Sequence, residues 1–334
     1  MEREQLLRDA CRVGDLQRVQ ELHGQGVQLT AASNSGGQPI HWAAQGGHLP
    51  VVQWLHGQGE PLTAASNNGG QPIHSAALGG DLPVVQWLHG QGVQLTAAGN
   101  DGGQPIHLAA HRGHLSVVQW LHGQGVPLTA ADNNASQPIH WAAQNGHLPV
   151  VQWLHGQGVP LTAASNGGLQ LIHWAARGGH LPVVQWLHGQ GVPLTAASND
   201  GGQPILLQPI CLAAENGHFP VVQWLHGQGV PLTVASNGGL QLIHFFAQAR
   251  YLPVVQWLLG QGVDFAGAKA SAHTAAAMSR LVGHIAVADW LDAVFSAPPA
   301  PSPEHPLAQH DEERRAKRQR IVGGAGSSSM ACPR

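Results

Sequence analysis

The sequence is poor in charged residues and in cysteine. Only 10% of its 334 residues are Asp, Glu, Lys or Arg, against roughly 25% in an ordinary soluble protein. The formal net charge is −3, and so few cations argue against direct nucleic-acid binding, which needs a basic surface. Three cysteines in the whole chain exclude a disulfide scaffold and fit a reducing compartment.

Signals for export or membrane insertion are also lacking. The first residues, Met1-Glu2-Arg3-Glu4, are too charged for a secretory signal. No run of about 18 apolar residues occurs, so we expect no membrane span. These absences predict an intracellular protein, located in the cytoplasm or the nucleus.

The few charges are unevenly placed. Nine fall within residues 2–21, and only nine more are spread over residues 22–263. Glycine (44 residues), histidine (23) and tryptophan (11) are abundant instead. An almost uncharged middle of this length needs an explanation, and an internal repeat supplies most of it.

A unit of 33 residues recurs along the chain. The tetrapeptide Gln-Pro-Ile-His starts at Gln38, Gln71, Gln104 and Gln137, and a variant starts at Gln170. Five additional residues at 203–207 delay the next motif to Gln208, and the period then resumes at Gln241. With atypical outer units that begin at Gln5 and Thr274, we count nine units.

One unit, residues 34–66, can be interpreted physically. Asn-Ser-Gly-Gly predicts a turn, and the following Gln-Pro starts a short helix, because proline is tolerated at the first helical position. Gly-Gly ends that helix, Leu-Pro starts a second one, and Gly57 and Gly59 end it. Neither helix is long enough to be stable alone, so stacked units must bury the apolar faces, as in a solenoid.

The recurring pattern Gly-x-Gln-Pro-Ile-His-x-Ala-Ala-x-x-Gly-His-Leu-x-Val-Val-x-x-Leu closely resembles the ankyrin repeat. The resemblance covers about residues 5–295 and implies an all-α solenoid with short β-hairpin turns. Some positions depart from the family pattern. Thr63, Thr96 and Thr129 replace an asparagine that is a hydroxylation target in some members, so we do not transfer that modification.

The repeats predict the domain organisation. We expect an N-terminal capping repeat at residues 1–37, seven ankyrin repeats over residues 38–273 and a C-terminal capping repeat at residues 274–295. Two units are irregular: Cys211 replaces the motif histidine near the 203–207 insertion, and Arg250-Tyr251 replace a Gly-His pair. Both irregularities fit tolerated drift or, alternatively, a hinge or a specific contact.

Residues 296–334 form a Pro/Gly/Ser-rich tail that we expect to be disordered. A basic cluster within it resembles a short nuclear-import signal. The cluster consists of Arg314, Arg315, Lys317, Arg318 and Arg320. Such clusters are frequent by chance, and three acidic residues precede this one, so a plain solvating tail is the alternative.

Histidine and tryptophan recur with the repeat, which favours structural roles. In ankyrin repeats the histidine of the Ile-His motif bonds to the backbone of adjoining turns. One histidine per repeat does not converge on a point, so we predict no metal site. Buried neutral imidazoles would make the protein less stable in acid. We find no phosphate loop or nucleophile motif, and we predict no catalytic residues and no cofactor.

Sequence differences between units gather at the hairpin tips and at the pair after Ala-Ala. In ankyrin-repeat proteins these positions line the concave face and contact partners; the alternative is neutral drift at exposed sites. The candidate partner-binding residues are Asp101, His111, Arg112, Asn134, Gln144, Asn145, Arg177, Asp200, Glu215 and Asn216. Arg112, Arg177 and Glu215 are the strongest candidates, because charge is scarce around them.

These observations predict a monomeric, non-catalytic scaffold or adaptor that binds other proteins and contacts neither nucleic acid nor membrane. One alternative is a nuclear regulatory cofactor imported through the basic tail. Another is an effector-type or structural array without a single fixed partner.

Overall fold

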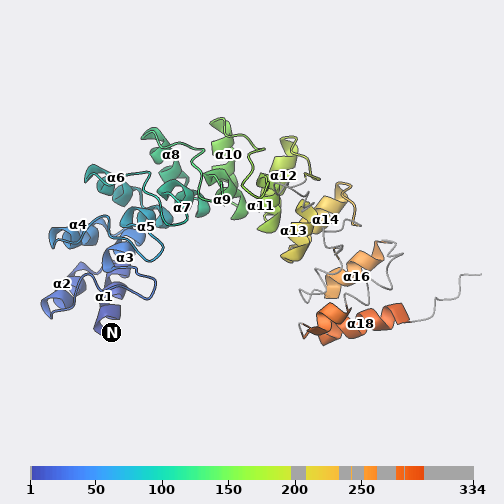
Figure 1. The fold of residues 1–334 in the computed structure, drawn as a ribbon, viewed down its shortest axis with the longest axis horizontal. Helices are drawn as coiled ribbons and strands as arrows, with labels where there is room; N and C mark the ends of the chain where they lie inside the picture. Colours follow the sequence, from blue (N-terminus) through green and yellow to red (C-terminus); the bar gives the residue numbers. More distant parts are fainter. Residues whose placement is uncertain are drawn as a thin grey trace, which may run out of the picture.

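The computed structural model describes residues 2–196, 208–232, 242, 252–261, 276–281 and 283–296. Pairs of antiparallel helices follow one another along an arc (Figure 1). The first helix of each pair lies on the inner side of the arc and the second helix on the outer side. The repeat solenoid predicted from the 33-residue period is therefore confirmed.

The helix bounds repeat with the sequence. The first helices are α1 (Glu2–Val13), α3 (Pro39–Gln45), α5 (Pro72–Gly79), α7 (Pro105–His111), α9 (Pro138–Gln144), α11 (Leu171–Arg177) and α13 (Pro209–Glu215). The second helices are α2 (Leu16–Gly24), α4 (Leu49–Gly57), α6 (Leu82–Gly90), α8 (Leu115–Gly123), α10 (Leu148–Gly156), α12 (Leu181–Gly189), α14 (Phe219–Gly227) and α16 (Leu252–Gly260). Helix α18 (Ile285–Ser296) follows near the end of the array. None of the helices in the described ranges is long and apolar enough to cross a membrane.

Local sequence sets where each short helix begins and ends. Helix α3 starts at Pro39, after an extended Gln38 whose backbone N–H donates to Nδ1 of His41 at 3.2 Å. This bond satisfies a donor at the helix start, as a capping side chain does. After the helix, Gly47 adopts a φ of +74°, a conformation that residues with a Cβ rarely adopt. The chain can therefore turn at once into α4.

One continuous core runs along the stack. In the second unit Ile40, Ala43 and Ala44 of α3 and Val52 and Leu55 of α4 are all 0% exposed, and the other units repeat this pattern. Alanine on the packed face lets neighbouring first helices approach closely. Since each helix pair buries its apolar side only against its neighbours, stability is shared between units along the array.

The turns between units stack on one another through asparagine. The first described turn closes with a bond from Ser33 N–H to the Gly37 carbonyl at 2.9 Å. The Asn67 side chain then donates to the Asn34 carbonyl at 3.0 Å, 33 residues away. Asn100, Asn133 and Asn166 repeat this bond, each to the preceding unit. We call this series the asparagine ladder.

The turns have the tight hairpin form that was predicted, with little strand pairing. Among the described residues the only β-bridge outside the helices is the antiparallel one between Ala164 and Gln170. The turns are held instead by single hydrogen bonds within and between units. The fold class is therefore helical, with hairpin-like turns.

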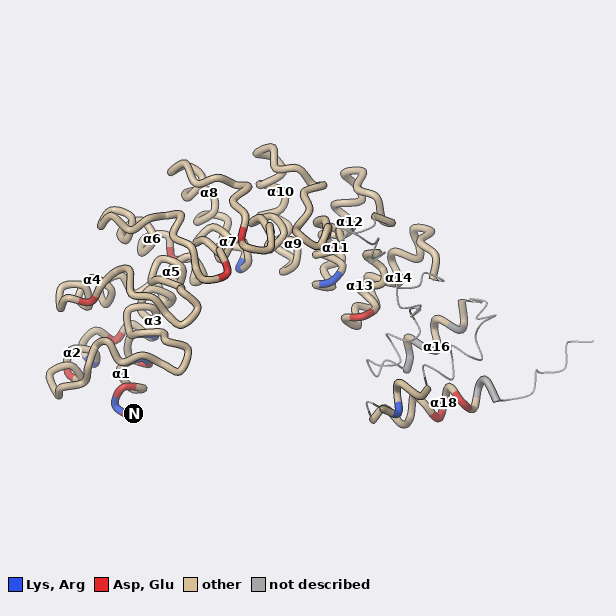
Figure 2. The backbone as a smooth tube through the Cα atoms, in the orientation of Figure 1, with Lys and Arg blue, Asp and Glu red and all other residues tan. Residues whose placement is uncertain are grey.

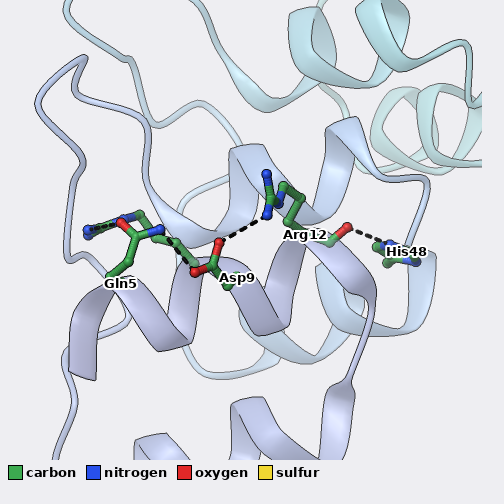
Figure 3. A network of polar contacts seen from close by, with 5 residues as sticks. Gln5, Asp9, Arg12 and His48 are labelled. Carbon is green, nitrogen blue, oxygen red and sulfur yellow. Dashed lines mark hydrogen bonds and ion pairs between the residues drawn. The ribbon is translucent and has the colours of Figure 1, made fainter. Parts of the chain in front are cut away.

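The first unit is charged outside and bonded to the second unit (Figure 3). The Asp9 carboxylate accepts from Gln5 Nε2 at 3.1 Å and lies 3.3 Å from the Arg12 guanidinium. The Arg12 carbonyl then accepts a hydrogen bond from His48 Nε2 at 2.9 Å. Because the side chains of Asp9 and Arg12 are 44% and 63% exposed, this ion pair contributes little to stability.

Candidate partner-binding surface

Each first helix carries two positions on the inner side of the arc: the residue after the motif histidine and the residue three later. Its other side chains, such as Ile40, His41 and Ala44, are buried, and in α13 the first of the two inner residues, Leu212, is only 4% exposed. Residues three apart share a helix face. Along the array these pairs are Trp42 and Gln45, Ser75 and Leu78, Leu108 and His111, Trp141 and Gln144, Trp174 and Arg177, and Leu212 and Glu215.

The two positions meet between neighbouring units. The His111 ring of α7 lies 5.5 Å from the Trp141 ring of α9, centroid to centroid. Trp141 in turn lies 6.5 Å from Trp174 of α11. We call the strip formed by these side chains, together with the turn tips beside it, the inner surface.

The turn tips form one edge of the inner surface. Asp101 and Asn134 are exposed there. Asp101 Oδ1 accepts from the Gly103 N–H at 2.9 Å, and the Asn134 N–H donates to Asp132 Oδ1 at 2.9 Å. Both residues therefore sit at fixed positions while their outer atoms face solvent.

The C-terminal ends of the first helices form the other edge, which contains the three charged candidates. Arg112 follows α7, Arg177 ends α11 and Glu215 ends α13, and all three are exposed. Within the described part of the chain their side chains form no hydrogen bond or ion pair. Figure 2 shows how sparse such charges are along the array. Among the described residues, these three charged side chains are therefore exposed and unpaired.

The uncharged candidates at this edge are more constrained. The Asn145 side chain donates to the Trp141 carbonyl at 2.9 Å, and the Asn216 side chain donates to the Leu212 carbonyl at the same distance. Gln144 and His111 are half-buried. Burial lowers the pKa of His111, and the nearby Arg112 and His147 lower it further. His111 is therefore a neutral ring at neutral pH.

The structure thus places the candidates in two rows rather than in one cluster. A seven-residue helix spans about 10 Å, which separates Asp101 and Asn134 from Arg112, Arg177 and Glu215. Asp200, the insertion at 203–207, the Arg250-Tyr251 pair and the basic cluster from Arg314 to Arg320 lie outside the described residues. Nuclear import through that cluster stays a prediction.

The motif histidines hold neighbouring units together, as the resemblance implied. His41 accepts the Gln38 N–H at Nδ1, and its Nε2–H donates to the Gly70 carbonyl of the next turn at 3.1 Å. His74, His107, His140 and His173 form the same two kinds of bond. Burial lowers the pKa of His41, His74, His107 and His140. The acceptor role of Nδ1 also requires a neutral ring.

Two further sets of repeated histidines, one before and one near the end of the second helices, are structural as well. A histidine precedes the second helices α4, α8, α10, α12 and α14, where α6 has Asp81 instead. It reaches back to the preceding unit; for example, His114 Nε2 donates to the Leu78 carbonyl at 3.0 Å. In the seven second helices from α2 to α14, the histidine near the helix end packs edge-on against the next unit's tryptophan, as His56 does against Trp87 at 5.9 Å. No group of three or more His, Cys, Asp or Glu side chains with metal-site geometry occurs in the ranges that the structure describes.

Two features of the inner and outer sides were not identified from the sequence. Ser75 stands where the units of α3, α7, α9, α11 and α13 have tryptophan or leucine, and a hollow opens there. Glu60 is 8% exposed, at a position where most units have a buried valine. Each is a single departure from the repeat consensus, so comparing the units position by position would have found both.

The geometry defines a class of protein: a solenoid of helix pairs with a variable inner surface and a constant outer one. Models of ankyrin repeats match this chain. A model described as ankyrin repeats (3 copies) matches residues 74–165 and 106–198, and one described as ankyrin repeats (many copies) matches residues 7–56, 41–89 and 210–259. No curated protein matches it. The chain belongs to the ankyrin-repeat family.

Proposed function

We propose that this chain is a scaffold or adaptor that binds a partner protein through its inner surface. Ankyrin repeats generally mediate protein–protein interaction and are typically non-catalytic. The proposal adds the location of the contact on this particular chain: the turn tips and the helix ends around Arg112, Arg177 and Glu215.

One contrast carries the proposal. Four outer helices, α4, α6, α10 and α12, have the identical sequence Leu-Pro-Val-Val-Gln-Trp-Leu-His-Gly. The first helices vary more at their C-terminal ends: α3 and α9 share one sequence, but α5, α7, α11 and α13 each end differently. The exposed charges of Arg112, Arg177 and Glu215 lie at these ends. A constant outer side and a variable inner side support selective binding on the inner one. Isolated charges on a neutral surface also select strongly between partners.

A binding measurement on the full chain tests the proposal. Proximity labelling in the native cell supplies a candidate partner, and calorimetry then measures its dissociation constant. We expect the variant R112A/R177A/E215Q to bind at least about tenfold more weakly, which corresponds to about 1.4 kcal/mol. The matched control R18A/E21Q removes an exposed ion pair on the outer helix α2 and should bind as the unaltered chain does.

Either of two results would contradict the proposal. Equal affinity of R112A/R177A/E215Q and the unaltered chain would remove these residues from the interface. A loss of binding in R18A/E21Q, with binding kept in the inner variant, would move the contact to the outer side.

A further inference from the structure

A hollow of about 430 Å³ lies on the inner surface between the second and fourth units. Its walls are Trp42 and Gln45 of α3, Ser75 and Leu78 of α5, and Leu108 of α7, with turn residues such as Asn68 at the rim. Pockets that hold a ligand side chain or a small molecule usually measure about 300–1,000 Å³. The hollow is therefore large enough for one bulky side chain.

The hollow exists because one unit lacks a large side chain. The residue after the motif histidine is tryptophan in three described units and leucine in two others, but it is Ser75 in the third unit. Where two such tryptophans follow each other, Trp141 and Trp174 pack at a centroid distance of 6.5 Å. Ser75 leaves the corresponding place beside Trp42 unfilled.

The lining of the hollow is uncharged. No Lys, Arg, Asp or Glu belongs to it. Leu78 occupies the position that carries Arg177 or Glu215 in later units, so this part of the inner surface lacks the charges found further along. Bringing a charged side chain into such a site would cost solvation energy without an ion pair in return. The hollow therefore favours an uncharged occupant.

Trp42 offers a hydrogen-bond donor that the described residues do not use. Its indole Nε1 is buried without a partner. In contrast, Trp141 Nε1 donates to Asp132 Oδ2 at 3.2 Å, and Trp174 Nε1 donates to the Leu169 carbonyl at 3.3 Å. The second unit has Ser33 where the fifth has Asp132, and the Ser33 hydroxyl already bonds to Gly37 N–H.

The unused donor lies at the edge of the hollow. A Cβ built on Gly37, which lines the hollow, would be 3.5 Å from Trp42 Nε1. Gly37 has no side chain, so a hydrogen-bond acceptor that lies against it can reach Trp42 Nε1 after a small adjustment of the indole ring. Such a bond would satisfy a buried polar group that is otherwise unpaired.

We propose that this hollow, the Ser75 pocket, receives an uncharged aromatic side chain from an extended segment of the partner protein. The incoming ring takes the place of the tryptophan that the third unit lacks and packs against Trp42. A backbone carbonyl of the same segment accepts the hydrogen bond from Trp42 Nε1. This inference rests on the proposed function, because it assigns a specificity pocket to the inner surface.

A titration of the full chain with N-acetyl-phenylalaninamide tests the pocket without a known partner. Indole N–H resonances of the protein labelled at tryptophan report each ring, and W42F assigns the Trp42 signal. We expect this signal to move with a dissociation constant of about 1 mM, as is usual for so small a ligand, while the Trp141 and Trp174 signals stay in place. N-acetyl-glutamate amide should leave all three unchanged.

Two substitutions at one position separate filling the pocket from disturbing the fold. S75W closes the pocket with a residue that other units carry at this position, and should abolish the shift of the Trp42 signal. S75A keeps the pocket open and should bind the probe as the unaltered chain does. If S75W does not fold, S75L replaces it, since Leu108 and Leu212 show that leucine is accommodated at this position.

The outcomes distinguish the pocket from the proposed function. No Trp42 shift up to about 20 mM probe, well above the expected constant, or an equal shift in S75W, would overturn the Ser75 pocket. Unchanged affinity of the S75W variant for the identified partner would overturn it as well. If R112A/R177A/E215Q loses the partner while the probe fails to bind, only the pocket is refuted. If the probe binds and that variant keeps full affinity, the charged interface is refuted instead.

Discussion

Glu60 allows a direct test of how much a buried, unpaired carboxylate lowers the stability of the array. Its side chain is 8% exposed, and Oε2 has no hydrogen-bond partner among the described residues. Burial raises the pKa of Glu60, while the nearby His23 acts in the opposite direction. The same position holds a buried valine in other units, namely Val27, Val93, Val126, Val159, Val192 and Val230. We therefore expect Glu60→Val to stabilise the protein.

The size of the effect follows from the lost polar group. Leaving a buried polar group unsatisfied costs about 1–3 kcal/mol. The methylene groups of Glu60 are already covered, so valine adds little further apolar burial. We expect the free energy of unfolding at pH 7.5 to rise by about 2 kcal/mol, measured by urea denaturation.

The pH dependence of this stability difference shows whether it comes from the buried charge of Glu60. Because the folded state raises the pKa of Glu60, the folded chain takes up a proton more readily than the unfolded one as the pH falls. Protonation then removes the penalty of the buried charge in the unaltered chain. The advantage of Glu60→Val should therefore narrow as the pH is lowered from 7.5 through the raised pKa of this carboxyl.

The matched control is Val93→Glu, which introduces a carboxyl group at the corresponding position of the next unit. Val93 is 4% exposed, so Val93→Glu should lose about as much stability as Glu60→Val gains. The reasoning is wrong if Glu60→Val is less stable than the unaltered chain, or if its advantage is the same at every pH.

Three further predictions follow from the described contacts. The four motif histidines whose pKa is lowered by burial bind fewer protons folded than unfolded, so the thermal midpoint should be lower at pH 5.5 than at pH 7.5; equal midpoints would contradict this. Burial raises the pKa of Cys11 to about 12 and that of Cys211 to about 11, so a Cys332→Ser variant should show no rapidly reacting thiol at pH 8 until it is denatured. Asn100→Ala removes one bond of the asparagine ladder, to the Asn67 carbonyl at 3.1 Å, and should cost about 1 kcal/mol in urea denaturation, whereas Gln58→Ala, on an exposed outer residue, should cost much less.

Much of the fold could be predicted because its determinants are local and repeated. Proline after Gln38 and glycine at Gly47 mark the start and end of a helix within the sequence itself, and both markers recur in most units. The stacking role of His41 also followed, because its partner lies in the adjoining turn. Local signals that recur are reinforced by every copy.

The inner surface was harder to predict because its contacts join different units. That His111 packs on Trp141 depends on how two first helices approach each other, which no single unit reveals. The Ser75 pocket depends on a side chain that is missing, and the role of Glu60 depends on the covered position of an otherwise ordinary carboxylate. This information lies in single departures from the repeat, and their effect depends on which side chains of neighbouring units surround them.

The ring contacts between second helices bear on how the number of repeat units in such a chain can change. His56 on Trp87, His89 on Trp120, His122 on Trp153 and His155 on Trp186 meet at 5.8–5.9 Å with nearly the same inclination. Because these contacts are nearly identical, removing one 33-residue unit from this stretch would again place a histidine of one second helix against a tryptophan of the next. Gene recombination between copies can therefore shorten or extend the array while these outer contacts are kept, and it changes the order of side chains along the inner surface.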